Sequence, residues 1–268
     1  MAAIPTEGGA VRRAVAEAGD LAAFSWYTLK ALARDTATGK LAWPEFLRQL
    51  WFMASVTTLP SVLVMIPFGV AVALNVGSLA AQIGAESYGG AIVAFLIIGQ
   101  AGPMVCALMI AGVGGSAITA DLGSRKIREE TDALEVMGIS TIARLVVPRV
   151  LAAAVVTVLL GAIVMVVGIA ASLAFHVFVL DGTAGSFLGT LTQFASLKDF
   201  ASAELKAALF GVLAALVASY KGLTVRGGPQ GVGNAVNEAV VLAFIAVFVA
   251  NTVISQVFPL FVPARGEY

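Results

Sequence analysis

The stretch DLGSRKIREETDALEVMGISTIARLVVPR, residues 121–149, decides how this chain folds. It carries ten charged residues, whereas the runs on either side of it, 87–120 and 150–180, carry none. Ionised side chains are costly at the centre of a bilayer, so a charged segment between two apolar runs of this length must lie at a membrane surface. We expect it to dock a partner in the water phase; the alternative is a solvated connection without a partner.

The composition is that of a membrane protein. Hydrophobic residues make up 59% of the 268 residues, charged residues only 12%, and the mean hydropathy is +0.96. Soluble domains carry about 25% charged residues, so we predict an all-α membrane protein with several spans. The one cysteine, Cys106, and the one histidine, His176, both lie in apolar runs, which argues against disulfides and metal sites.

Five transmembrane helices fit the apolar runs and define a membrane domain over 52–262. The expected spans are 54–83, 91–120, 149–180, 201–221 and 238–262. The first contains Pro60 and Pro67, which should kink or break it. The fourth is the weakest, because only 207–220 is uncharged; it becomes long enough if Lys206 snorkels outward, and a re-entrant segment is the alternative.

Residues 1–51 precede the first span and hold all three tryptophans together with several lysines and arginines. That combination is typical of the headgroup region of a membrane. We expect one or two amphipathic helices lying in the interface, at about 21–36 and 43–51, and poor order at the start of 1–20. A soluble N-terminal helix is the alternative.

The connections between the spans differ in character. Residues 181–202 predict a polar loop, and 221–237 predict a Gly-rich turn without the phosphate-loop pattern. The segment 121–148 should contain a helix over 131–137 that ends at Gly138. Its expected apolar stripe consists of Ile127, Leu134, Met137 and Ile139.

Lysine and arginine are distributed unevenly between the two sides of the membrane. Of the 16, thirteen lie before the first span, in 121–149 or in 221–233, and three lie on the other side. Cytoplasmic connections carry the excess of positive charge. The N-terminus, the charged segment and the Gly-rich turn should therefore be cytoplasmic, and the C-terminus should lie outside.

The chain lacks the residue sets that catalysis requires, so we expect neither an enzyme nor a nucleic-acid-binding protein. No apolar run carries the paired carboxylates of a proton relay, so energy for transport would come from a partner. An apolar path suits a lipid better than an ion or a sugar. Its candidate residues are Pro60, Pro67, Asn75, Gln100, Asn251 and Gln256, although each polar one could instead make an interhelical hydrogen bond.

Two segments resemble the MlaE/YrbE family of permeases. They are GQAGPMVCALMIAGVGGSAITADLGSRKIREETDALEVMGISTIARLVVPRVLA, residues 99–152, and KGLTVRGGPQGVGNAVNEAVV, residues 221–241. Together they cover about a quarter of the chain. The resemblance implies the permease subunit of an ABC-type lipid transporter in a bacterial plasma membrane, with no catalytic site or cofactor of its own.

The same resemblance implies the partners. A second YrbE-type permease, two cytoplasmic ATPases that bind ATP and Mg²⁺, and extracytoplasmic MCE-domain proteins would together move lipids or fatty acids, in the mycobacterial branch as import. The segment 124–138 would be the coupling helix that fits the ATPase. Its candidate contact residues are Arg128, Glu129, Glu130, Asp132, Leu134, Glu135, Met137 and Gly138. A non-transporting anchor for an ATPase or an MCE assembly is the alternative.

Two departures from the family pattern fall in the second span. Many members have Arg-Glu before Phe-Gly-Pro where this chain has GQAGP at 99–103. Many also have Ala-Gly-Arg where this chain has Ala111-Gly112-Val113. Because these charges are lost, we expect the chain to pair with a non-identical permease.

Overall fold

The computed structural model describes residues 7–39, 41–82, 84 and 88–261 of the chain. Within these ranges the regular structure is helical and no strand occurs, which confirms the predicted all-α fold. In chain order the helices are α1 (Glu7–Ala37), α2 (Trp43–Gln82), α3 (Gly89–Leu96), α4 (Gly102–Met109), α5 (Gly115–Ile127), α6 (Glu130–Val136), α7 (Val147–Phe178), α8 (Ala184–Phe194), α9 (Leu197–Leu223) and α10 (Gly228–Phe261).

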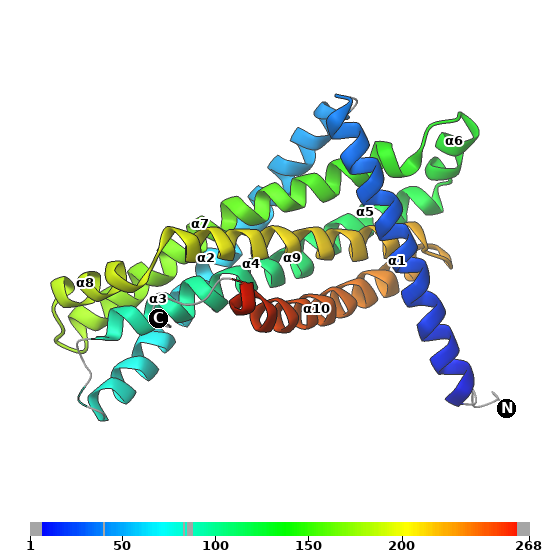
Figure 1. Ribbon diagram of the computed structural model, residues 1–268. Coiled ribbons are helices and arrows are strands. Elements are labelled where there is room, and N and C mark those ends of the chain that lie inside the picture. The colour runs from blue at the N-terminus through cyan, green and yellow to red at the C-terminus, as the bar shows by residue number, and fades with distance from the viewer. Residues whose placement is uncertain (1–6, 40, 83, 85–87, 262–268) are drawn as a thin grey trace.

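In the part of the chain that the structure describes, five helical runs are long and apolar enough to cross a membrane, as predicted. They are Trp43–Ala80, Gly89–Ile127, Ile142–Phe178, Leu197–Leu223 and Gly228–Val257. The fourth is one continuous helix of 27 residues, so the re-entrant alternative is wrong. Figure 1 shows the runs forming one elongated bundle, with α1 and α6 at one end and α8 at the other. We call these the α6 end and the α8 end.

The first span differs from its prediction at its start, and of the two effects expected of its prolines, a kink or a break, the break does not occur. The separate interfacial helix expected at 43–51 is instead the beginning of α2, a single helix of 40 residues that is also unbroken at Pro60 and Pro67. Packing against α7 holds it: Ser172 donates a 2.8 Å hydrogen bond to the carbonyl of Gly69. The backbones are so close there that a Cβ on Gly69 would lie 2.6 Å from the Gly168 oxygen. Neighbouring helices support prolines in membrane spans in this way.

The second span is one helical run with two irregular turns. π-helical turns at Ile97–Ala101 and Ile110–Gly114 separate α3, α4 and α5. After the second of these turns, α5 packs closely on α9, where Thr119 donates a 3.0 Å hydrogen bond to the Ala218 carbonyl. The run extends seven residues past the predicted end at residue 120, so the charged segment begins inside the helix.

The polar loop predicted over 181–202 is wrong, because helical structure occupies most of it. α8 begins after Thr183, whose hydroxyl accepts a hydrogen bond from the Ser186 N–H. α9 begins after Ser196, which forms a reciprocal capping box with Asp199. These caps satisfy N–H groups that would otherwise lack partners, and they start helices even in a polar stretch.

The Gly-rich turn predicted over 221–237 is also shorter than expected. α9 continues to Leu223 and α10 begins at Gly228, so only four residues connect them. The reversal uses the positive φ of Gly227 (89°) and Gly228 (72°), which other residues adopt only with strain. Pro229 follows in the first turn, where its missing N–H costs nothing.

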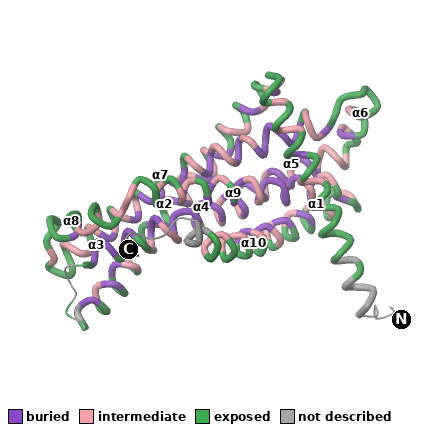
Figure 2. Tube along the Cα trace, in the orientation of Figure 1, coloured by how far each residue is buried: buried purple, intermediate pink, exposed green. Residues whose placement is uncertain are grey.

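The N-terminal helix is longer than the 21–36 prediction. α1 starts at Glu7 and crosses the spans at the α6 end (Figure 1). One face packs on the bundle through Leu21 and Phe24, while Trp26 and Tyr27 are exposed. Figure 2 shows the same division, with buried residues along the bundle interior and exposed ones along α1. Its position in a membrane interface stays a prediction, and residues 1–6 lie outside the described residues.

Candidate functional site

The charged segment folds into a short helix with an apolar tip. The single helix predicted over 124–138 is wrong: α5 ends at Ile127, and α6 spans Glu130–Val136. The chain turns between them because Glu129 adopts a left-handed conformation with φ of 58°. At the end of α6, Val136 is 90% exposed, and Met137, the next residue, is 64% exposed. Apolar side chains this exposed at the end of a charged segment suit a docking surface.

The end of α6 is fixed by its backbone. The N–H of Gly138 donates to the Glu135 carbonyl, and the N–H of Ile139 donates to the Leu134 carbonyl, both at 2.9 Å. With φ of 74° at Gly138, these bonds form a Schellman motif, which confirms the predicted helix end. Of the predicted stripe, Leu134 packs inward, whereas Met137 and Ile139 point to solvent with Val136. We call Val136, Met137 and Ile139 the apolar tip.

Ion pairs within the segment balance most of its charges. Lys126 binds Asp132 at 2.5 Å, and Arg128 binds Glu130 at 2.7 Å. The hydrogen bond from the Arg128 guanidinium lowers the pKa of the Glu130 carboxyl and raises that of Arg128. Both groups are exposed, so the pair orders the turn more than it stabilises the fold. Among the predicted contact residues, Glu129 and Glu135 are exposed.

A buried arginine connects this segment to the spans. Arg149, at the start of α7, is fully buried and binds Asp121 of α5 at 2.5 Å and Glu45 of α2 at 3.3 Å. Its Nη1 also donates to the Leu145 carbonyl at 2.5 Å. A buried charge is stable only when it is paired and hydrogen-bonded. This group, the Arg149 cluster, therefore ties α2, α5 and α7 together beside α6.

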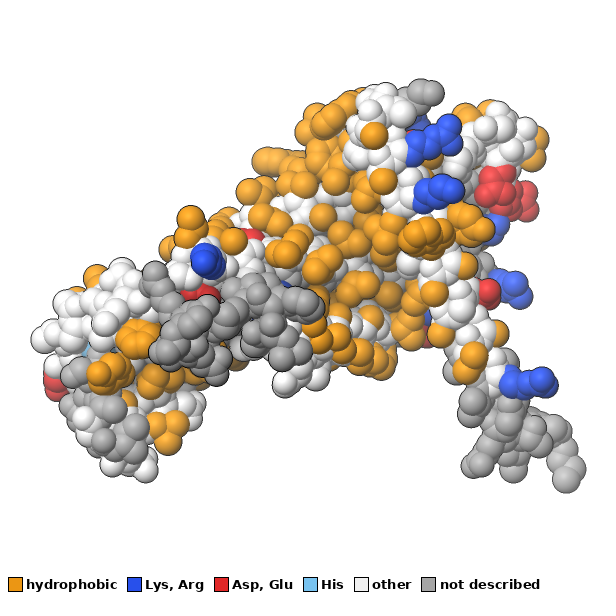
Figure 3. Space-filling model, viewed as in Figure 1, with side chains coloured by type: hydrophobic (Ala, Val, Ile, Leu, Met, Phe, Trp, Pro, Cys, Tyr) orange, Lys and Arg blue, Asp and Glu red, His pale blue; other side chains and the backbone are white. Residues whose placement is uncertain are grey.

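A second cluster joins three further helices at the same end. Lys221 of α9 pairs with Glu17 of α1 and, at 2.9 Å, with Glu238 of α10. Figure 3 shows that most charged side chains on this face of the molecule lie at the α6 end, beside a broad hydrophobic surface along the spans. Together the two clusters include one charged residue from each of the five candidate spans.

The predicted lipid-path residues do not gather in one cavity of this chain. On α2, Pro60 is half-buried, while Pro67 and Asn75 are exposed, and the Asn75 amide donates to the Ala71 carbonyl of its own helix at 2.7 Å. Gln100 is half-buried and Gln256 is exposed. Asn251 alone approaches another helix through its side chain, 3.8 Å from the Met104 sulfur.

Two charged residues in α9 were missed or misplaced by the sequence prediction. Lys206 does not snorkel outward: it is 8% exposed and lies 3.5 Å from the Gly99 carbonyl and 3.4 Å from the Ser255 hydroxyl. Glu204 packs against Gly161 of α7, and neither carboxyl oxygen has a hydrogen-bond partner within the described residues. The sequence itself shows both charges inside the fourth span, and a charged residue within a span is by default a candidate functional residue.

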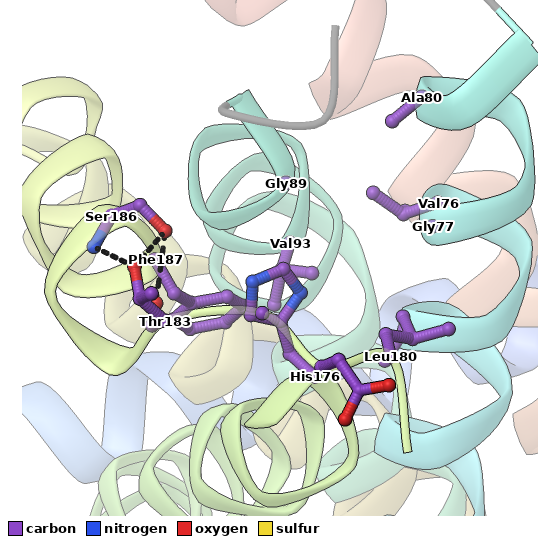
Figure 4. A pocket seen from close by; sticks show the side chains of 13 residues that line it. Val76, Gly77, Ala80, Gly89, Val93, His176, Leu180, Thr183, Ser186 and Phe187 are labelled. Atoms are coloured by element: carbon purple, nitrogen blue, oxygen red, sulfur yellow. Dashed lines mark hydrogen bonds between the residues drawn. The ribbon is translucent and has the colours of Figure 1, made fainter. Parts of the chain in front are cut away.

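A cavity lies at the α8 end, far from the charged segment. It has a volume of about 360 Å³ and opens between α2, α3 and α8, as Figure 4 shows. His176 lines it and packs against Phe187, with ring centroids 5.3 Å apart and the rings tilted by 42°. None of the predicted lipid-path residues contributes to its wall.

Two bacterial relatives of this chain have the same description. A protein of Rickettsia bellii named "Probable ABC transporter permease protein" is 29% identical over 248 residues, which cover 92% of this chain and 95% of that protein. A Synechocystis protein with the same description is 32% identical over 64% of this chain and 65% of its own length.

A plant relative carries a lipid in its name. The Arabidopsis thaliana "Protein TRIGALACTOSYLDIACYLGLYCEROL 1, chloroplastic" is 30% identical over 63% of this chain, which spans about half of that protein (48%). The family model "Permease MlaE" matches residues 46–257, that is, everything from the start of α2 to the last residues of α10. The chain therefore belongs to the MlaE permease family.

Proposed function

We propose that the chain is the membrane subunit of an ATP-driven lipid transporter, and that α6 is the element through which a cytoplasmic ATPase drives it. The observation that carries this proposal is the apolar tip, held out from the membrane domain beside the Arg149 cluster. Family membership and the descriptions of the relatives support a permease. ATP and Mg²⁺ would be bound by the ATPase, not by this chain.

The proposed coupling runs through named contacts. Closure of the ATPase on ATP would push the apolar tip. α6 would transmit that push to α5, because Lys126 of α5 pairs with Asp132 of α6 at 2.5 Å and Arg125 lies 3.8 Å from Glu130. It would also reach the chain leading into α7, because the Thr141 hydroxyl donates to the Thr131 carbonyl of α6. Arg149 would then carry it to α7 and α2. A small displacement at one end can shift packed helices between two arrangements.

Lipid is the cargo that the surfaces favour. α10 presents an exposed apolar face through Val241, Ile245 and Val249, and α2 presents another through Leu59 and Leu63. Faces of this kind suit acyl chains or a second permease. The plant relative named after a glycolipid points the same way.

The assembly and orientation are part of the same proposal. The chain would lie in a bacterial plasma membrane with the α6 end in the cytoplasm and the α8 end outside. It would pair with a second YrbE-type permease and receive lipids or fatty acids from MCE-domain proteins, in the direction of import. A purified homodimer with full transport activity would contradict the non-identical partner.

The test is transport by the reconstituted complex in liposomes. Val136→Asp puts a charge on the apolar tip, so we expect lipid movement and lipid-stimulated ATP hydrolysis to fall by about tenfold or more, as for the loss of an interface hot spot. Val136→Leu keeps the tip apolar and should leave both rates near those of the native chain. Equal rates in the two variants would refute the coupling role.

The same experiment separates the alternative function. A non-transporting anchor would still bind its ATPase and assemble, but liposomes containing the native complex and ATP would show no lipid movement. Movement that depends on ATP and on an intact tip excludes the anchor.

A further inference from the structure

The cavity at the α8 end has the size of a ligand site, with one apolar wall and one polar wall. Its volume of about 360 Å³ falls near the lower limit of small-molecule pockets, roughly 300–1,000 Å³. It is therefore large enough for one chain of an amphiphile and too small for a complete two-chain lipid. The residues that line it come from α2, α3, α7, the 180–183 connection and α8.

One wall of the cavity is apolar and built from small residues. Along α2 it consists of Ala73, Val76, Gly77 and Ala80. Figure 4 shows Val76, Gly77 and Ala80 on one helix, across the opening from Ser186 and Phe187 of α8. Small side chains on one helix face leave room beside it that larger ones would fill, and this wall offers an alkyl chain no polar group.

The opposite wall is polar, but only part of it is free to bind. Thr183 and Ser186 are occupied with each other, since their hydroxyls lie 2.9 Å apart and Ser186 also donates to the Thr183 carbonyl at 2.9 Å. Within the described residues no hydrogen bond reaches the ring nitrogens of His176. Asp181 is exposed in a left-handed conformation with φ of 53°. His176 and Asp181 are thus the groups that can meet a ligand.

The charge of this wall selects among ligands. Among the described residues that line the cavity, Asp181 has the one carboxylate, and none is a lysine or an arginine. A carboxylate or phosphate on the ligand would be repelled. A hydroxyl suits both groups, because it can donate to a carboxylate and exchange a hydrogen bond with an imidazole nitrogen.

We propose that this cavity binds a single-chain lipid with an uncharged, hydroxyl-bearing end. The alkyl chain lies along the α2 wall and the hydroxyl meets His176 and Asp181. The site rests on the proposed lipid transport and adds to it a selective binding step at the end opposite α6.

The experiment uses two photoactivatable probes of equal chain length, each with a diazirine in the alkyl chain: a monoacylglycerol and a fatty acid. The complex is labelled in its native membrane and the attachment sites are located by mass spectrometry. We expect the monoacylglycerol probe to label residues 73–93 or 176–187 saturably and the fatty-acid probe to label them several-fold less.

Two pairs of variants decide the result. Ala80→Phe fills the cavity and should lower labelling by about tenfold, since a pocket discriminates by roughly that factor for even one methylene. Leu79→Phe, on the exposed side of α2, should not change it. Asp181→Asn, at a φ that asparagine tolerates, should raise labelling by the fatty-acid probe until the two probes are equal.

The same labelling experiment also gives the results that would contradict the proposed site. No labelling of the cavity, equal labelling in Ala80→Phe and Leu79→Phe, or unchanged preference in Asp181→Asn would each overturn the site. Because the readout is binding, a complex that transports lipid without labelling here refutes this site alone. A labelled cavity in a complex that moves no lipid refutes the transport proposal and leaves the site.

Discussion

The two ends of the bundle differ in whether their buried charged side chains are paired with opposite charges. At the α6 end, Arg149 and Lys221 each bind two carboxylates from neighbouring helices. Toward the α8 end, Lys206 has only two neutral oxygens near it and Glu204 has no hydrogen-bond partner in the described part of the chain. Among the described residues the Arg149 Nε atom also has no hydrogen-bond partner, but its charge is paired. Buried charges paired with opposite charges resist rearrangement, whereas buried charges without such a partner favour it. This difference indicates a rigid α6 end and an adaptable half toward the α8 end.

The largest expected effect comes from breaking the rigid end. Arg149→Met leaves Asp121 and Glu45 without their shared cation, so we expect the free energy of unfolding to fall by roughly 3 kcal/mol. That value is at the low end for a broken buried pair, because the Asp121 side chain is 39% exposed. Denaturant titration of the purified chain in detergent measures it.

The matched control is Arg48→Met, which removes the other arginine on Glu45. Its side chain is 72% exposed, so the loss should stay below about 1 kcal/mol. Similar losses in the two variants would mean that the Arg149 cluster does not hold the three helices together.

A second prediction tests the adaptable half. Glu204→Leu removes two unsatisfied carboxyl oxygens beside Gly161, so the chain should become more stable by about 2 kcal/mol. Glu204→Gln keeps a polar group there and should change little. Destabilisation by the leucine variant would show that Glu204 has a partner in the assembled protein, and the contrast between the two ends would then fail.

The third prediction concerns the left-handed turn at Gly138, which ends α6 next to the apolar tip. Gly138→Ala forces a side chain into a left-handed conformation and should cost about 1 kcal/mol. Gly233→Ala, inside α10 with open space around the added methyl group, should be neutral or stabilising by about 0.5 kcal/mol. Thermal melting of both variants checks this, and equal shifts would exclude a strained turn at Gly138.

The smallest effect is a pH dependence at the same end. Because Arg128 lowers the pKa of Glu130 in the folded chain, this pair stabilises at pH values above the ordinary glutamate pKa of about 4.3, and its contribution disappears as the pH falls through the lowered value. Melting of Glu130→Gln and the native chain from pH 7 to acid should therefore converge at low pH. A constant difference would contradict the pair.

The fold was predictable where long apolar runs determine it. The five candidate spans and the helix end at Gly138 follow from hydropathy and glycine. The sequence predictions were wrong where the helix depends on a local cap or on packing between helices. α8 begins at the Thr183 cap inside a polar stretch, and α2 is continuous through its prolines and packs closely on α7 at Gly69. Neither contact is visible from composition.

The candidate site was predictable in part, for a similar reason. Position and charge identify α6, but which apolar residues face outward depends on the turn at Glu129, which composition does not reveal. Val136 was therefore missed. The cavity at the α8 end joins residues more than 100 positions apart, such as Val76 and Phe187, so no local pattern could predict it.

The most direct test of the coupling role is the affinity of the purified permease for its ATPase, measured for the native chain, Met137→Asp and Met137→Leu. We predict that the aspartate variant binds at least about tenfold more weakly, that the leucine variant binds as the native chain does, and that all three melt alike. Unchanged affinity in Met137→Asp would show that the apolar tip is not the docking surface and would contradict the proposed path from ATPase to membrane.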